Sequence, residues 1–143
     1  MTTQASTNSE ATAQTGAVLE PDPKRNGELL KLPGSAQVYL VLNGFRRWLP
    51  PPLTFQLLFV SNAKITEDPN LGDIPEGRAL SSQAVLIKEL EEAEIYLFTD
   101  GVKMWVPTPD IFNLYQFDWN KLGQFSAAFM DAIPKGPDIE GRA

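Results

Sequence analysis

An internal repeat with a spacing of 57 residues most constrains how this 143-residue chain can fold. At least nine residues recur with the same identity at that spacing, among them the pairs Tyr39/Tyr96, Trp48/Trp105 and Phe55/Phe112. A later Ile-Pro-x-Gly motif recurs at a spacing of 59, which indicates two extra residues in the second copy. Self-similarity of this kind predicts two structural units that bury their apolar faces against each other.

The repeat divides the chain into four parts. Residues 1–16 are mostly Thr, Ser, Gln and Ala, and such a stretch cannot bury enough apolar surface to offset chain entropy. We therefore predict a disordered tail there. Residues 17–27 contain two Pro and one Gly and should form an extended lead-in. Residues 28–83 form repeat 1 and residues 84–143 form repeat 2, and both should share one globular domain.

Each copy predicts a strand, a hairpin, a short helix and an extended return. Asn43-Gly44 and Asp100-Gly101 lie between alternating apolar runs, a pattern that favours a two-residue type I′ turn. The Pro-x-Pro after each hairpin ends the strand, and short helices are expected over 53–60 and 110–117. The predicted fold class is α+β, with two tandem β-hairpin plus short-helix repeats, pseudo-two-fold symmetry and an antiparallel sheet.

The hairpin turns also fix which side chains share a face. The register places Tyr39 opposite Trp48 and Tyr96 opposite Trp105. One face of each hairpin is largely aliphatic and should point to the core. The other face repeats the Tyr/Trp pair together with one cation, Arg46 in the first copy and Lys103 in the second.

The repeated aromatic face has two interpretations, and the sequence leaves both open. It could be a ligand platform, in which rings pack against the C–H face of a sugar and the cation donates to its hydroxyls. It could equally cover the helix of its own repeat as part of the core. Trp119 has no counterpart in the first copy and is either a binding residue or a core plug. The candidate ligand-binding residues are Tyr39, Arg46, Trp48, Tyr96, Lys103, Trp105 and Trp119.

Composition excludes several classes of chemistry. The chain has no His and no Cys, which excludes a Ser-His-Asp triad, disulfides and Cys-ligated metal sites. Gly-rich phosphate loops are absent as well. We therefore predict a non-enzymatic protein with no cofactor and no metal. The acidic run Glu89, Glu91, Glu92 and Glu94 could supply carboxylates for glycoside hydrolysis, but its clustering in one segment favours a solvated strand edge.

Charge and hydropathy bear on partners and location. A net charge of −6 argues against nucleic acid as a partner. No apolar run approaches the ~20 residues of a membrane span, so no membrane insertion is expected. The N-terminus lacks the basic and apolar regions of a signal peptide. We therefore expect a cytoplasmic protein, with an extracellular location only through truncation of the sequence or unconventional export.

Two resemblances follow from these motifs. The unit Leu-Lys, Val-Tyr-Leu, Asn-Gly, Arg-Arg-Trp-Leu-Pro and Ile-Pro-x-Gly resembles a hairpin repeat of secreted and surface-associated bacterial proteins, over most of residues 28–137. That repeat is not tied to one activity. In its size, its lack of Cys and its duplicated Tyr/Trp hairpin, the chain also resembles small cytoplasmic lectins of mushroom fruiting bodies. This second resemblance implies a homodimeric lectin that binds fucosylated or galactosylated mucin-type glycans and acts as a defence toxin.

The expected function is therefore carbohydrate binding, with glycans or glycoproteins as partners and a homodimer as the assembly. The alternative is a structural or protein-interaction module with no small-molecule ligand, in which the aromatic faces meet across the pseudo-two-fold axis or a dimer interface. A third hypothesis is a His-free glycosidase, but the sequence offers no good pair of facing carboxylates for it.

Overall fold

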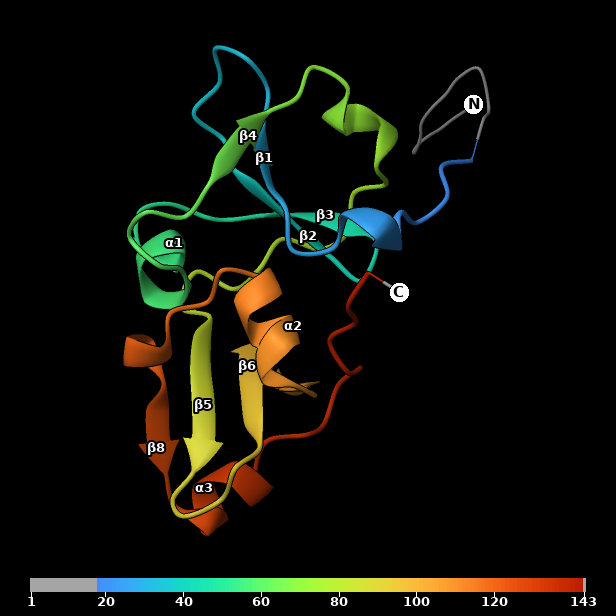
Figure 1. Ribbon diagram of the computed structural model, residues 1–143. Helices are drawn as coiled ribbons and strands as arrows, with labels where there is room; N and C mark the ends of the chain where they lie inside the picture. Colours follow the sequence, from blue (N-terminus) through green and yellow to red (C-terminus); the bar gives the residue numbers. More distant parts are fainter. Residues whose placement is uncertain (1–17, 143) are drawn as a thin grey trace.

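The computed structural model describes residues 18–142, and its mixed α and β content is arranged around two four-stranded sheets (Figure 1). The predicted tail of residues 1–16 lies outside the described residues. The first sheet has the order β3-β2-β1-β4. The second sheet has the order β7-β6-β5-β8. The strands are β1 (Leu29–Lys31), β2 (Tyr39–Leu42), β3 (Phe45–Trp48), β4 (Ile65–Glu67), β5 (Val85–Glu89), β6 (Ile95–Thr99), β7 (Val102–Val106) and β8 (Gly123–Phe125).

Three short α-helices connect and cover the sheets. Helices α1 (Thr54–Leu58) and α2 (Pro109–Leu114) lie between the two sheets, and α3 (Ala127–Asp131) lies at the far end of β5 and β8 (Figure 1). The first two confirm the helices predicted over 53–60 and 110–117, apart from their exact ends. The elements of residues 18–142 are completed by three single 3-10 turns: η2 (Pro23–Arg25), η3 (Leu71–Asp73) and η4 (Trp119–Lys121). No helix in residues 18–142 is long and apolar enough to cross a membrane.

The hairpin register predicted from the turns is confirmed. Tyr39 pairs with Trp48 in the first sheet, and Tyr96 pairs with Trp105 in the second. Both turns have two consecutive residues with positive φ, as a type I′ turn requires. These angles are 52° and 87° for Asn43 and Gly44, and 58° and 78° for Asp100 and Gly101.

The prediction of an antiparallel sheet is wrong, because each sheet is mixed. β1 pairs antiparallel with β2 but parallel with β4, and β5 likewise pairs parallel with β8. The reason is the path of the chain. The return strand reaches the sheet only after the hairpin and the helix have reversed the chain once more, so it runs in the direction of the first strand.

A further extended segment lies along the outer edge of each hairpin. The Leu80 N–H donates to the carbonyl of Trp48 at 3.0 Å, and the Ile139 N–H donates to the carbonyl of Trp105 at 2.8 Å. Both Leu80 and Ile139 are buried, at 2% and 1% exposure. These two segments therefore close the hairpin edges and deliver one aliphatic side chain each to the core.

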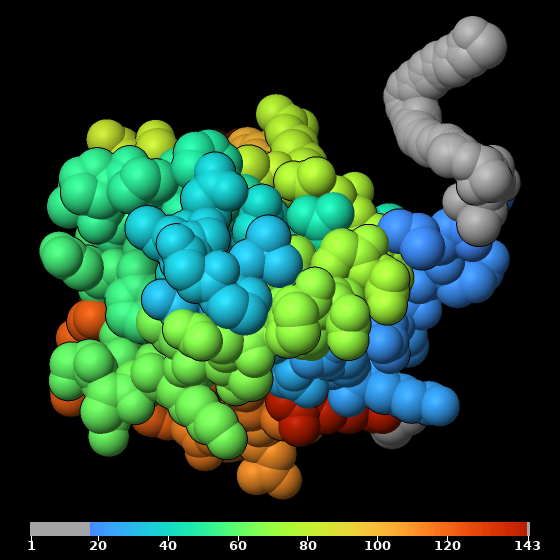
Figure 2. Space-filling view, turned by 90° about the horizontal axis from the view of Figure 1, so that it is seen from above, coloured from blue at the N-terminus to red at the C-terminus, as the bar shows by residue number. Residues whose placement is uncertain are grey.

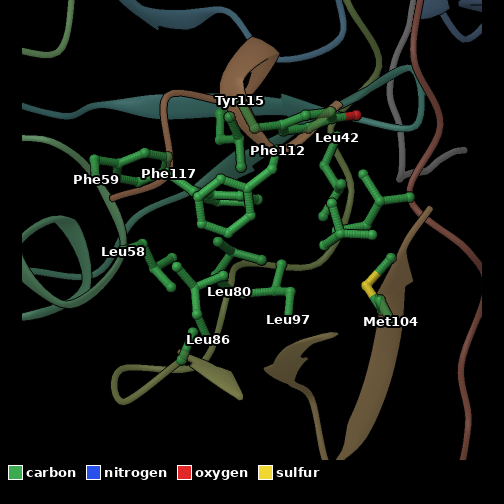
Figure 3. Packing of buried hydrophobic residues seen from close by; sticks show 14 of the residues in the cluster. Leu42, Leu58, Phe59, Leu80, Leu86, Leu97, Met104, Phe112, Tyr115 and Phe117 are labelled. Carbon is green, nitrogen blue, oxygen red and sulfur yellow. The ribbon is translucent and has the colours of Figure 1, made fainter. Parts of the chain in front are cut away.

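One hydrophobic core lies between the sheets and draws on both of them (Figure 3). Leu42 of β2 and Leu97 of β6 face it from the two sides. Phe59, Tyr115 and Phe117 are each at most 2% exposed, and the ring of Phe117 lies 5.6 Å from both other rings. Helix α1 packs against β5 and α2 against β7. Each sheet thus depends on the other for the burial of its inner face.

Polar contacts at the two hairpin turns join the halves at the rim of this core. Asn43 bonds to the C-terminal segment: its Nδ2 donates to the Asp138 carbonyl at 2.9 Å, and its Oδ1 accepts from the Glu140 N–H at 2.8 Å. At the turn of the second hairpin, the Asp100 carboxylate pairs with the guanidinium of Arg47 from the first half, with 2.5 Å between Oδ2 and Nη2. Seen from above, the red C-terminal segment accordingly lies beside the blue residues of the lead-in (Figure 2).

We expect Leu80→Ala and Ile139→Ala each to lower the free energy of unfolding by about 2–5 kcal/mol, because each opens a cavity in the shared core. Urea titrations followed by tryptophan fluorescence and by far-UV circular dichroism measure this. The two probes should report one coincident transition for wild type and variants, since the core belongs to both halves. Glu140→Ala is the matched control, because that side chain is exposed. Separate transitions would contradict a shared core.

Candidate functional site

Two pockets with corresponding linings lie at the ends of the two hairpins. Their volumes are about 310 Å³ and 330 Å³. Nine of the ten residues that line the first have a counterpart 57 positions later in the second. The first pocket is lined by Ala36, Gln37, Val38, Trp48, Leu49, Pro50, Pro51, Pro52, Phe55 and Ile65. The second is lined by Ala93, Glu94, Ile95, Trp105, Val106, Pro107, Thr108, Pro109, Phe112 and Trp119.

Three elements build each pocket. The last strand of the hairpin supplies a Trp, the Pro-x-Pro supplies a wall whose backbone cannot easily rotate, and the following helix supplies a Phe. In the second pocket the helix start is fixed by its cap, because the Thr108 hydroxyl accepts from the Ile111 N–H at 3.1 Å and Pro109 is the first helical residue. The Pro-x-Pro, which the sequence indicated as a strand terminator, therefore also shapes a pocket.

The two pockets differ in polarity. The first is apolar except for Gln37, whereas the second contains Glu94, Thr108 and Trp119. Trp119 is 45% exposed, and its ring centroid lies 3.9 Å from that of Phe112. Its indole N–H donates to Asn113 at 2.9 Å, which fixes the ring as a wall. The second pocket thus combines two indoles with a carboxylate.

Trp48 presents only carbon surface to the first pocket. Its indole N–H is buried and meets no acceptor among the described residues. A buried N–H without a partner costs about 1–3 kcal/mol, since it has lost its bond to water. The first pocket therefore offers a ligand an aromatic ring without a hydrogen-bond donor from that ring.

The other four predicted site residues do not line these two pockets. The Arg46 guanidinium lies 5.3 Å from the Tyr39 ring, and its Nε donates to the carbonyl of Ile74 at 2.8 Å. The Lys103 ammonium lies 5.1 Å from the Tyr96 ring and donates to the carbonyl of Met130 at 2.7 Å. Both cations are therefore engaged with a tyrosine and with the chain that follows the return strand.

The same chain partly covers the predicted aromatic platform. In the first half Tyr39 packs against a small cluster that includes Leu71 and Ile74, both from the segment around η3. In the second half α3 packs against β5, and its residue Met130 is buried, at 2% exposure. The structure therefore brings Trp48, Trp105 and Trp119 to the two pockets, whereas Arg46 and Lys103 each donate to a backbone carbonyl.

Sequence reasoning missed Glu94 as a pocket residue. It was interpreted as part of a solvated acidic edge, yet it lines the second pocket and also a smaller depression of about 150 Å³. That depression contains Tyr96 and Lys103 together with the acidic side chains Glu89, Glu92 and Asp131. The signal that could have found it is the replacement of Gln37 by Glu94 within an otherwise corresponding set of pocket residues.

The described residues offer little for acid–base or metal chemistry. No group of three or more His, Cys, Asp or Glu within residues 18–142 is arranged to hold a metal ion. Burial raises the pKa of the Tyr115 phenol, whose hydroxyl donates to the carbonyl of Glu140 at 2.7 Å. That phenol anchors the C-terminal segment inside the protein. The open pockets are suited to binding by ring stacking and apolar contact.

No protein-family model matches the chain, and no curated protein or solved structure matches it either. The function therefore has to be inferred from the pockets themselves.

We expect Trp48→Phe to change the free energy of unfolding by no more than about 1 kcal/mol, because the loss of ring area is offset by removal of the unsatisfied N–H. Trp105→Phe is the matched variant, since Trp105 has no such buried orphan group, and it should be the more destabilising of the two. Chemical denaturation of both variants measures the difference. The opposite order would show that the Trp48 N–H is satisfied in solution.

Proposed function

We propose that the chain consists of two tandem copies of one hairpin–helix unit, related by a pseudo-two-fold axis, and that it binds carbohydrate without catalysing a reaction. The two sheets have the same strand order, which supports the repeat. So do paired hydrogen bonds: the Arg46 N–H donates to Pro75 at 2.9 Å, and the Lys103 N–H donates to Pro134 at 2.9 Å. The corresponding linings of the two pockets are a third line of support.

The proposal that the protein binds carbohydrate rests on the second pocket. A pyranose has an apolar C–H face and a rim of hydroxyls, so its site needs an aromatic wall and a few polar groups. Trp105 and Trp119 supply the wall, and the Glu94 carboxylate supplies an acceptor for hydroxyl groups. Among the described residues, Glu94 alone brings a carboxylate to this pocket, whereas glycoside hydrolysis ordinarily uses two that flank the bond. The pocket is therefore better suited to binding than to hydrolysis.

The sugar class and the assembly remain part of the proposal. Fucosylated and galactosylated glycans, a defence role and a cytoplasmic location follow from the resemblance to mushroom lectins. A homodimer would present several weak sites at once, and the resulting effective concentration would raise avidity for branched glycans.

The first pocket favours a second candidate function, a protein-interaction module. It is lined almost wholly by apolar side chains, and its Trp offers no donor. Leu53 and Ile65 beside it are 45% and 38% exposed. An apolar surface of this kind suits an apolar protein segment better than a sugar.

A glycan array with labelled protein tests the carbohydrate proposal. We expect wild type to bind a defined set of glycans and Trp119→Ala to lose about fivefold in affinity, since stacking on one ring is worth roughly 1 kcal/mol. Trp119 is exposed, so this variant should keep its fold. The double variant Trp48→Ala/Trp105→Ala, checked by circular dichroism, should abolish binding.

Three results would separate the candidates. Binding that survives in a folded Trp48→Ala variant but not in Trp119→Ala would assign the sugar to the second pocket. Binding unchanged in every folded variant would keep a lectin but remove both pockets from it. No binding of wild type to any glycan would contradict the carbohydrate proposal and favour the protein-interaction module.

A further inference from the structure

We propose that the second pocket recognises an organic ammonium group, so that among glycans it selects sugars with a free, protonated amine. This inference rests on the proposed carbohydrate-binding function and names the ligand class for the same pocket. It depends on three features of the described residues: the aromatic walls, the carboxylate of Glu94 and the charge around the pocket.

The aromatic walls are suited to a cation. Trp105 and Trp119 both line the pocket, and Phe112 lies against Trp119 at 3.9 Å between centroids. The face of an indole ring attracts an ammonium through the ring quadrupole, and Trp is the strongest of the aromatic residues in this respect. Trp105 already receives one cation in the folded chain, because the Lys135 ammonium lies 5.6 Å from its ring centroid.

The carboxylate of Glu94 is available to pair with a ligand. Ion pairs in residues 18–142 involve other acidic residues, and none reaches Glu94. Lys135 does not line the pocket, and its ammonium pairs with Asp138 at 3.2 Å. An ammonium in the pocket would therefore meet a carboxylate that forms no ion pair with any cation of residues 18–142.

The charge around the pocket has the same sign as Glu94. The depression that shares Glu94 holds the carboxylates of Glu89, Glu92 and Asp131 against the single ammonium of Lys103. Clustered charge of one sign raises the local concentration of the opposite ion. The acidic run thus attracts a cationic ligand toward the two indoles and disfavours an anionic one.

The first pocket provides an internal comparison within the same chain. Gln37 stands where the second pocket has Glu94, and Ile65 completes the lining in place of Trp119. The remaining positions correspond, including the Trp at the hairpin end. The features that favour an ammonium are therefore the features in which the two pockets differ.

The test compares galactose, N-acetylgalactosamine and galactosamine, each carried on the same polymer so that valency is equal, by biolayer interferometry on the full chain. These sugars differ only at C2, and only galactosamine carries an ammonium. We expect galactosamine to bind roughly five- to tenfold more tightly than the other two, as one cation–π contact and one exposed ion pair together allow. Equal binding of all three would overturn the ammonium proposal and leave carbohydrate binding intact. No binding of any sugar would contradict the proposed function itself.

Matched variants locate the effect. Glu94→Gln copies the residue of the first pocket, removes the negative charge and keeps one carbonyl oxygen that can accept from a sugar hydroxyl. It should lower the affinity for galactosamine to about that for N-acetylgalactosamine, so that the ratio of the two affinities approaches one. Gln37→Ala in the first pocket should change neither. Both positions are exposed, so the variants should fold, and thermal melting checks this. A preference that survives in Glu94→Gln would overturn the assignment to this pocket.

A salt control distinguishes specific recognition from general attraction. Tetramethylammonium chloride should displace the galactosamine polymer more effectively than sodium chloride at the same ionic strength, because only the organic cation stacks on indole. Both salts screen charge equally. Equal displacement by the two salts would reduce the preference to long-range electrostatics and overturn the proposed ammonium site.

Discussion

Burial of aromatic rings between the two sheets is the interaction on which the remaining structure depends. The strands are three to five residues long, and a sheet of such strands has too little apolar area on one face to be stable alone. Phe59, Phe112, Tyr115 and Phe117 fill the space between the sheets and pack on both inner faces. Because α1 packs on β5 of the other sheet, the halves cannot separate without exposing these rings.

The pockets are extensions of this core. Rings follow one another from Phe55 to Phe59 at 5.2 Å, on to Phe117 at 5.6 Å, to Phe112 at 5.5 Å and to Trp119 at 3.9 Å. The first ring of this series lines the first pocket, and the last two line the second. A ligand in either pocket would therefore rest on side chains whose positions are fixed by the hydrophobic core, which lowers the entropic cost of binding.

Local signals in the sequence predicted the hairpins well, but they did not predict the parallel return strands or the segments that cover the hairpins. Asn43-Gly44 and Asp100-Gly101 specify their turn through backbone angles that few other residues adopt, so register and facing residues followed directly. The parallel pairing of β4 and β8 depends on where the chain returns after the helix, which no local pattern encodes. The cover over Tyr39 escaped prediction for the same reason. The sequence identified Trp48, Trp105 and Trp119 as candidates but not the Pro-x-Pro walls or Glu94. A pocket forms where segments that are far apart in the sequence meet in the fold, and local patterns do not encode such meetings.

The positions at which the two pockets differ indicate that the pockets bind different kinds of ligand. The rings and prolines that shape each pocket also contact the core or end a strand, so a change there would cost stability as well as binding. Gln37 and Glu94 line the pockets but are exposed. These two positions can differ while the fold is kept, because they carry little of the packing. A duplicated unit can in this way keep one scaffold and still present an apolar pocket at one end and a carboxylate-bearing aromatic pocket at the other.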